Sequence, residues 1–120
     1  MTAPKTTAPN DVFSALAVEK VRGRNGEELG KVEDFVLDID SGRVAYAVVS
    51  FGGTLGVGDR LFAVPPEALA RDAGDGFVLD AERSTLARAP AFDRGDWPDF
   101  GDRTLGADIY SFYGRTPYWA

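Results

Sequence analysis

The stretch that decides the fold runs from Gly26 to Val64 and reads GEELGKVEDFVLDIDSGRVAYAVVSFGGTLGVGDRLFAV. Apolar residues alternate along it and glycine-containing turns interrupt it, which predicts a series of β-strands. Within it, the segment from Asp38 to Arg43 has the composition of a hairpin loop. Asp38 is placed to accept backbone N–H groups at the start of the turn, and Gly42 can adopt the positive φ angle needed at its end.

The length of this loop sets the register of the two strands, because a slip of one residue turns every side chain to the opposite face. We take the loop to have an even length, since that choice keeps the large apolar residues on one face. A four-residue loop from Ile39 to Gly42 pairs Asp38 with Arg43, Leu37 with Val44 and Phe35 with Tyr46. A two-residue loop at Ser41-Gly42 would keep the same residues on each face. The large apolar residues expected to be buried together are Phe35, Leu37, Val44, Tyr46 and Val48. The opposite face carries the smaller apolar residues Val36, Ala45, Ala47 and Val49.

A strand pair that is apolar on both faces has to be covered on both. A small, closed or nearly closed β-barrel does this, with large side chains inside and a helix or tail packed outside. The step from Val32 to Phe35 is one residue longer than strict alternation gives, which predicts a β-bulge at Glu33 and Asp34. The expected fold class is therefore mainly β: a small antiparallel barrel with a short helix and an aromatic-rich, partly helical C-terminal tail.

Four segments resemble the PRC-barrel family in order and spacing: residues 26–34 (GEELGKVED), 38–43 (DIDSGR), 51–58 (FGGTLGVG) and 63–65 (AVP). The family joins the cytoplasmic domain of the photosynthetic reaction-centre H subunit with the C-terminal domain of a ribosome-maturation factor. Stand-alone bacterial members with similar aromatic tails also belong to it. The resemblance covers residues 16–90 and implies a small β-barrel used as an interaction module, with no family-wide catalytic residues.

Composition excludes several classes of function. The 120 residues carry a formal charge of −6 and contain neither Cys nor His. The acidic balance argues against nucleic acid, which needs a basic footprint, and against docking on anionic lipid. The missing residue types remove disulfides, thiolate metal sites and the commonest general base. With no apolar run long enough to insert in a membrane, we expect a cytoplasmic protein with no cofactor and no catalytic residues.

The chain divides into three expected parts: a disordered leader at residues 1–14, the barrel at 15–90 and an aromatic extension at 91–120. Within the barrel, residues 17–22 predict a first strand and Asn25-Gly26 the turn that follows it. Residues 65–69 predict one helical turn, and residues 70–72 and 77–80 a closing hairpin. Residues 82–89 predict a short helix with Leu86 facing inward.

The extension is rich in aromatic residues and contains one further predicted helix, from Thr104 to Tyr113. Its apolar stripe is Leu105, Ile109 and Tyr113, with Phe112 beside it. Asp102 or Thr104 is expected to cap its start, and Gly114 to end it. Either the extension wraps its own barrel or it docks on a neighbouring protein.

Two apolar residues, Leu55 and Val57, stand in the glycine-dense loop that joins two strands. A phosphate-binding loop would open a helix, whereas this one leads into a strand, so we interpret it as a hairpin loop. Its apolar residues either cover the barrel mouth or contact a partner. The candidate partner contacts are Leu55, Val57, Trp97, Phe100, Ile109, Tyr113 and Trp119.

The acidic residues do not form a convincing metal site. Asp38 and Asp40 weakly resemble a calcium loop, but the required Glu at its twelfth position is absent. An acidic residue recurs at every third position from Asp93 to Asp102. The Gly and Pro residues between them oppose the helix that would align them. We therefore expect no metal site, with a weak cation site as the alternative.

The leading hypothesis is a non-enzymatic interaction module, acting as a protein–protein adaptor or assembly factor. The alternative is a barrel that binds a small ligand or metal in a bacterial stress response. We also expect a homodimer in which the tail contacts the second subunit, especially through Trp97, Ile109, Tyr113 and Trp119. A monomer whose tail folds back on its own barrel is the competing hypothesis.

Overall fold

The computed structural model describes residues 19–51, 60–71 and 76–119. Short strands and three short helices follow one another along this part of the chain. They are β1 (Glu19–Arg22), β2 (Glu28–Asp38), β3 (Arg43–Phe51), β4 (Arg60–Val64), the 3₁₀ helix η2 (Pro66–Ala68), β5 (Leu69–Arg71), β6 (Phe77–Leu79), α1 (Arg83–Leu86), β7 (Phe92–Asp93) and α2 (Arg103–Phe112).

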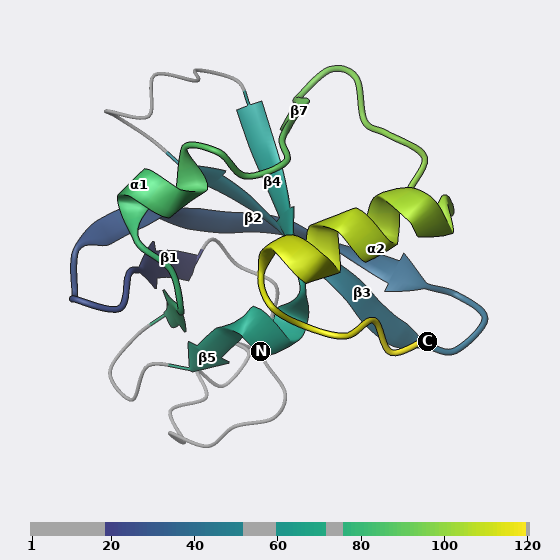
Figure 1. Ribbon diagram of the computed structural model, residues 1–120, viewed down its shortest axis with the longest axis horizontal. Coiled ribbons are helices and arrows are strands. Elements are labelled where there is room, and N and C mark those ends of the chain that lie inside the picture. The colour runs from purple at the N-terminus through teal and green to yellow at the C-terminus, as the bar shows by residue number, and fades with distance from the viewer. Residues whose placement is uncertain (1–18, 52–59, 72–75, 120) are drawn as a thin grey trace, which may run out of the picture.

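The seven strands form a curled sheet in the order β5-β6-β1-β2-β3-β4-β7. The helix η2 joins β4, near one edge, to β5 at the other, so the sheet curls into a half-barrel (Figure 1). The predicted small β-barrel is confirmed. One pairing departs from the antiparallel prediction, because β6 runs parallel to β1. This pair joins segments that are distant in sequence, and turn signals report only neighbouring strands.

The β2–β3 hairpin has the predicted loop and the predicted bulge. β2 ends at Asp38 and β3 begins at Arg43, which face each other. Gly42 has a φ of 75°, as expected for the last position of the turn. The ladder shifts between Val32 and Asp34, so the bulge predicted from the spacing of apolar residues is confirmed.

A second shift in this ladder makes part of the predicted register wrong. Leu37 faces Val44 as predicted, but the next pair is Val36 with Tyr46. The extra residue, Ala45, lies on β3, and it turns the following side chains to the other face. Phe35 therefore faces Ala47 and not Tyr46. A regular sequence of small apolar residues contains no signal for a bulge at this point.

The five residues predicted to be buried together consequently separate. Phe35 packs against the inner core and Tyr46 belongs to an outer cluster, while Leu37 is 60% exposed. The side of β3 that was predicted to be the outer face, with Ala47 and Val49, lies inside the barrel. The inner core consists of Val21, Leu29, Val32, Ala47, Val49, Phe51, Phe62, Val64, Ala68, Leu79, Ala81 and Leu86.

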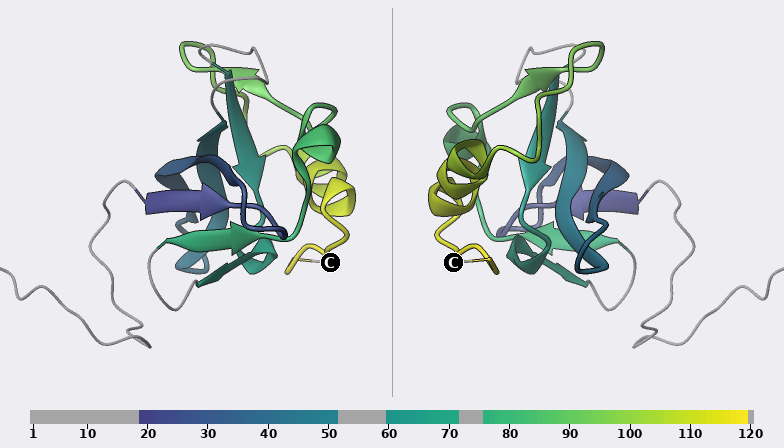
Figure 2. Two further views of the ribbon diagram at one scale, coloured as in Figure 1. Left: turned by 90° about the vertical axis from the view of Figure 1, so that its left-hand side faces the viewer. Right: turned by 90° about the vertical axis from the view of Figure 1, so that its right-hand side faces the viewer.

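The outer cluster lies between the sheet and α2, which packs along the outside of the barrel (Figure 2). Its buried members are Ala45, Tyr46, Ala63, Ile109 and Tyr110. Helix α2 begins as predicted, because the Asp102 carboxylate accepts the N–H of Thr104 at 2.9 Å. It ends at Phe112 and is terminated by Gly114 as predicted, where φ is 72°. The N–H groups of Gly114 and Arg115 donate to the carbonyls of Ser111 and Tyr110 in a Schellman motif.

The predicted stripe of α2 is offset by about one residue position. Its buried residues are Gly106, Ile109 and Tyr110, whereas Leu105 is half-buried. Sequence reasoning missed Tyr110 because Gly106, the residue that admits it to the stripe, has no hydrophobic side chain to mark the face. The smaller predictions, namely the turn at Gly26, the closing β5–β6 hairpin and the inward Leu86, are confirmed.

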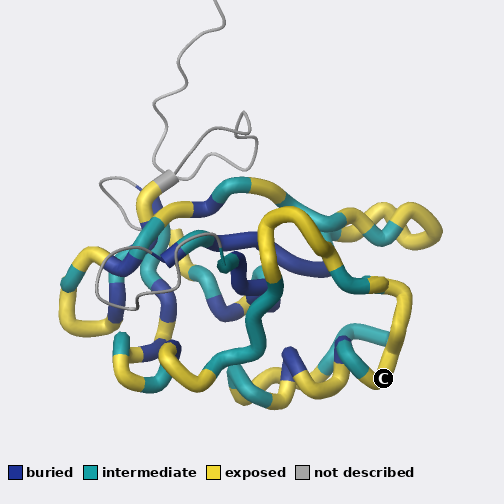
Figure 3. The backbone as a smooth tube through the Cα atoms, turned by 90° about the horizontal axis from the view of Figure 1, so that it is seen from above, coloured by how far each residue is buried: buried dark blue, intermediate teal, exposed yellow. Residues whose placement is uncertain are grey.

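Buried segments gather in the middle of the molecule and exposed ones in the turns at its periphery (Figure 3). The leader at residues 1–14 lies outside the described residues. Among the helices described, none combines the length and the apolar character needed to cross a bilayer.

Candidate functional site

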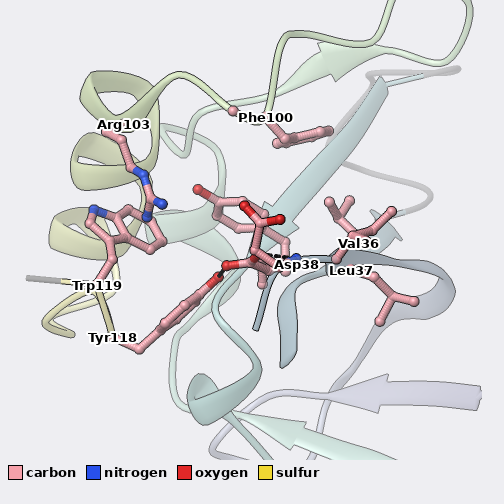
Figure 4. A pocket seen from close by; sticks show the side chains of 12 residues that line it. Val36, Leu37, Asp38, Phe100, Arg103, Tyr118 and Trp119 are labelled. Carbon is pink, nitrogen blue, oxygen red and sulfur yellow. Dashed lines mark hydrogen bonds between the residues drawn. The ribbon is translucent and has the colours of Figure 1, made fainter. Parts of the chain in front are cut away.

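A cleft of about 360 Å³ lies between the β2–β3 hairpin and the C-terminal tail (Figure 4). One wall comes from the end of β2 and the turn that follows it. The opposite wall comes from the start of α2 and the last residues of the tail. The lining residues are Val36, Leu37, Asp38, Ile39, Asp40, Ala45 and Tyr46 from the hairpin, and Phe100, Gly101, Arg103, Tyr118 and Trp119 from the tail.

Asp38 organises the hairpin wall. One of its carboxylate oxygens accepts the N–H groups of Asp40 and Ser41, at 3.1 and 3.3 Å. The other accepts the hydroxyl of Tyr118 at 2.5 Å. The hydrogen bond from Tyr118 lowers the pKa of the Asp38 carboxyl, and the two backbone N–H groups add to this effect. A single side chain thus fixes the turn and joins it to the tail.

The tail wall is held by stacked cations and rings. The guanidinium of Arg43 lies 4.3 Å from the centre of the Tyr118 ring. That of Arg103 lies 4.6 Å from the centre of the Trp119 ring. Trp119 also packs edge-on against Tyr110 of α2 at 5.3 Å. Cation–π contacts of this kind contribute about 0.5–1 kcal/mol each at exposed positions, so the tail end has several modest anchors.

Gly106 lets the helix approach these rings closely. A Cβ atom at this position would lie 2.5 Å from the hydroxyl oxygen of Tyr46 and 2.7 Å from the ring of Trp119. Real Cβ atoms do not approach other heavy atoms so closely. The tail therefore sits in its observed position only because residue 106 has no side chain.

Two tyrosines form the base of the cleft and the layer behind it. Tyr46 packs against Phe100 at 5.1 Å and against Tyr110 at 5.6 Å. Burial raises the pKa of the Tyr46 phenol to about 12, so the group is protonated at neutral pH. The Tyr110 hydroxyl donates a hydrogen bond of 2.7 Å to the carbonyl of Ala45. That carbonyl belongs to the residue that bulges from β3.

The comparison with protein families agrees with this architecture. The model of the PRC-barrel domain matches residues 13–84, more than half of the 120-residue chain. The chain belongs to the PRC-barrel family. The match ends before the cleft-forming tail, so the cleft joins the PRC barrel to an extension outside the matched region. A search of curated proteins returned no match to the chain.

The candidate contacts predicted from sequence are distributed unevenly over this PRC barrel. Phe100 and Trp119 line the cleft, and Trp97, 41% exposed, packs against Phe100 at 6.1 Å. Ile109 is buried on its own barrel, which leaves it no surface for a partner. Tyr113 is half-buried and packs against both the inner core and the outer cluster. Leu55 and Val57 lie outside the described residues.

Sequence reasoning missed most of the polar residues of the cleft. Asp38 was interpreted as a turn residue after a calcium loop was considered and rejected, although it also binds Tyr118, which is 80 positions away. Arg103 was not singled out at all. The one available signal was the position of Arg103 directly before the predicted helix and beside its candidate cap Asp102, since an acidic residue is the favoured choice at a helix start.

Charges at the cleft are only partly paired. Within the described ranges, the carboxylate of Asp40 makes no ion pair, and Arg103 contacts the Trp119 ring but no carboxylate. Groups of three or more potential metal-binding side chains do not occur in the part of the chain that the structure describes.

Proposed function

We propose that this protein is a non-catalytic interaction module that docks a partner protein. The docking face is formed by the cleft and the tip of the β2–β3 hairpin, residues Leu37–Asp40. The observation that carries this proposal is the exposure of Leu37 and Ile39 at the edge of an aromatic cleft. Scattered apolar residues are normal on a protein surface, but apolar residues grouped beside a groove are typical of binding sites.

The build of the face supports binding to protein. Tyr, Trp and Arg, which dominate the binding energy at protein interfaces, supply the tail wall as Tyr118, Trp119 and Arg103. The turn is fixed by hydrogen bonds to Asp38, so it loses little conformational entropy when a partner binds. A preformed tip beside an aromatic wall favours a short apolar segment as the partner element.

The chemistry of the cleft supports a role without catalysis. One of its two acidic groups, Asp38, is engaged by the turn and by Tyr118, and its pKa is lowered, so it is a poor general base. The Tyr46 phenol, with its raised pKa, is a poor acid or nucleophile at neutral pH.

Site-specific photo-crosslinking in cells tests this proposal. A photoreactive amino acid replaces Ile39 in one variant and Arg88, an exposed residue in the turn after α1, in the control. We expect a defined protein adduct from position 39 and none of the same mass from position 88. Leu37→Ser in the same chain should remove the adduct. Equal labelling from both positions, or none from position 39, would contradict the proposal.

A small-ligand site in the same cleft is the second candidate. Its volume of about 360 Å³ falls in the range of ligand pockets, about 300–1,000 Å³, and its lining combines aromatic, aliphatic and charged residues. A thermal-shift screen of small anions and aromatic compounds would test it. A rise in melting temperature that Phe100→Ala abolishes, without loss of fold, would favour this alternative over protein docking.

A further inference from the structure

The hairpin tip is the most exposed apolar part of the described chain. The large apolar residues that are exposed in the described part of the chain are Ile39 at 85%, Leu37 at 60% and Trp97 at 41%. Two of these three belong to the tip, which projects from the sheet as the β2–β3 turn (Figure 1). The cleft lies directly beside them, because both residues line it. A protruding apolar group and a receiving groove therefore occupy one face.

The tip cannot fold into its own cleft. The N–H of Gly42 donates a 2.7 Å hydrogen bond to the carbonyl of Asp38, and the N–H groups of Asp40 and Ser41 bind the Asp38 carboxylate. These bonds hold the turn in one conformation. The Asp38 side chain is in turn held by Tyr118 across the cleft. Filling the groove thus requires a group other than the hairpin tip of the same copy.

The charges of the tip and of the cleft are complementary. Asp40 at the tip has a carboxylate without a cationic partner among the described residues. Arg103 on the opposite wall has a guanidinium stacked on Trp119 but no carboxylate partner there. Both groups lie on the same face, and within the described chain one is an anion without a cationic partner and the other a cation without an anionic partner. A second molecule with the same face would satisfy both.

We propose that a second copy of this chain docks on the face, with the Leu37–Asp40 tip of each copy entering the cleft of the other. This inference rests on the proposed docking function and names its partner. In a two-fold arrangement the same patch serves both molecules, so each Asp40 meets the Arg103 of the other copy. Ile39 is then covered by the aromatic wall formed by Phe100 and Trp119.

This arrangement differs from a dimer built by the tail. The tail residues Ile109 and Tyr110 are buried on their own barrel and have nothing to offer a second copy. The tail instead forms the receiving wall, through Arg103, Tyr118 and Trp119. Each site is incomplete without the other molecule, because Ile39 and Asp40 of one copy complete the cleft of the next.

Two charge reversals, applied singly and then mixed, test the pairing. The variants are Asp40→Arg and Arg103→Asp, and their masses are measured by sedimentation velocity at low salt. The wild-type chain should have twice the 12.9 kDa mass of one copy. Each single variant should dimerise at least about tenfold more weakly, because like charges then face each other at both contacts.

Mixing the two variants is the decisive step. One variant then contributes two cations and the other two anions, so both contacts regain opposite charges. An equimolar mixture should therefore dimerise again at wild-type strength. The controls Glu82→Arg and Arg88→Asp reverse charges at exposed positions at and beside α1, and they should leave association unchanged. Ile39→Ser, at an exposed position that contributes nothing to the core, should weaken the dimer without changing the circular dichroism spectrum.

A monomeric wild-type chain would overturn the inference, and so would single variants that dimerise normally or a mixture that fails to recover. These results do not decide whether the face docks a partner protein, because crosslinking at Ile39 tests that function separately. If Ile39 crosslinks in cells to a different protein while the purified chain is monomeric, the face docks a partner but not a second copy. If Ile39 gives no adduct at all, both proposals fail.

Discussion

The inner core and the outer layer of this PRC barrel are both built on strand β3, but their chemistry differs. The inner core contains aliphatic residues and phenylalanines, and no polar residue is buried in the described part of the chain. The outer layer also contains aliphatic residues and phenylalanines, but it adds Tyr and Trp, and some of its hydroxyl groups reach specific partners such as the Ala45 carbonyl and the Asp38 carboxylate. The stability of the inner core depends only on how its side chains fill the space, while the stability of the outer layer also depends on the orientation of its hydrogen bonds.

Removing volume from the inner core should give the largest effect. Phe51 is 2% exposed and its ring lies 4.7 Å from that of Phe62. Phe51→Ala should lower the free energy of unfolding by about 3–5 kcal/mol, as for other buried aromatic truncations. Urea denaturation followed by circular dichroism measures it. A loss below 1 kcal/mol would mean that the barrel interior is not a close-packed unit.

Adding one methyl group to the outer layer should be the next largest effect. Gly106→Ala places a Cβ against Tyr46 and Trp119, and such overpacking costs about 1–3 kcal/mol. The change should alter tryptophan fluorescence, because Trp119 has to move. Gly95→Ala is the matched control, since nothing lies within 4 Å of its Cβ position. Equal stability of the two variants would show that the tail is not seated on Gly106.

Removing the hydroxyl oxygen should change stability differently at two tyrosines, Tyr110 in α2 and Tyr113 directly after it. Tyr110→Phe deletes a buried hydrogen bond to Ala45 and should cost about 1–2 kcal/mol, because the carbonyl is left unpaired. Tyr113→Phe deletes a buried hydroxyl that has no hydrogen-bond partner among the described residues, so stability should be equal or higher. Thermal unfolding of the two variants side by side measures the difference. Equal losses would contradict the view that direction matters in this layer.

The smallest expected effect concerns the ion pair that ties the start of the tail to β2. Arg94 donates two hydrogen bonds to Glu33, at 2.6 and 3.2 Å. Hydrogen bonding to Arg94 is the main reason why the pKa of Glu33 is lowered to about 2. In the unfolded chain the carboxyl titrates near its ordinary value of 4.5. The unfolded state therefore binds more protons between these pH values, and stability rises with pH through this window.

The contribution of this pair is complete above the ordinary pKa of Glu33 and lost as pH falls towards 2. Since the Arg94 side chain is 47% exposed, we expect about 1 kcal/mol or less at neutral pH. Glu33→Gln should remove that part of the pH dependence, measured by urea denaturation from pH 2 to 6. An unchanged pH profile in this variant would contradict the assignment.

Most of the barrel could be predicted from the sequence, because its signals are local. The turn at Gly42, the bulge at Glu33 and the cap at Asp102 each follow from residues within a few positions. The bulge at Ala45 could not be predicted, since its neighbours are equally small and apolar. That single residue determines which face of β3 lies inside the barrel. As a result, Leu37 is exposed and Tyr46 belongs to the outer cluster.

The candidate site was less predictable, because it is assembled from distant segments. Phe100 and Trp119 of the aromatic tail were singled out from the sequence as candidate partner contacts. The contacts that place them join the β2–β3 hairpin to the last residues of the chain, as in the bond from Tyr118 to Asp38. No spacing along the sequence encodes such a contact.

The parallel pairing of β1 with β6 has a consequence for the order in which the protein folds. Val21 pairs with Phe77, so β6 joins the half-barrel through a contact between segments far apart in sequence, and such contacts form slowly. The β2–β3 hairpin and β4 can form earlier, since their pairings are local. Beside this pair Gly76 has a φ of 78° and passes so close to Lys20 that a Cβ atom would lie 2.4 Å from its carbonyl oxygen. A glycine at position 76 is thus a condition for the pairing of β1 with β6, and during synthesis one edge of β1 stays unpaired until this residue is available.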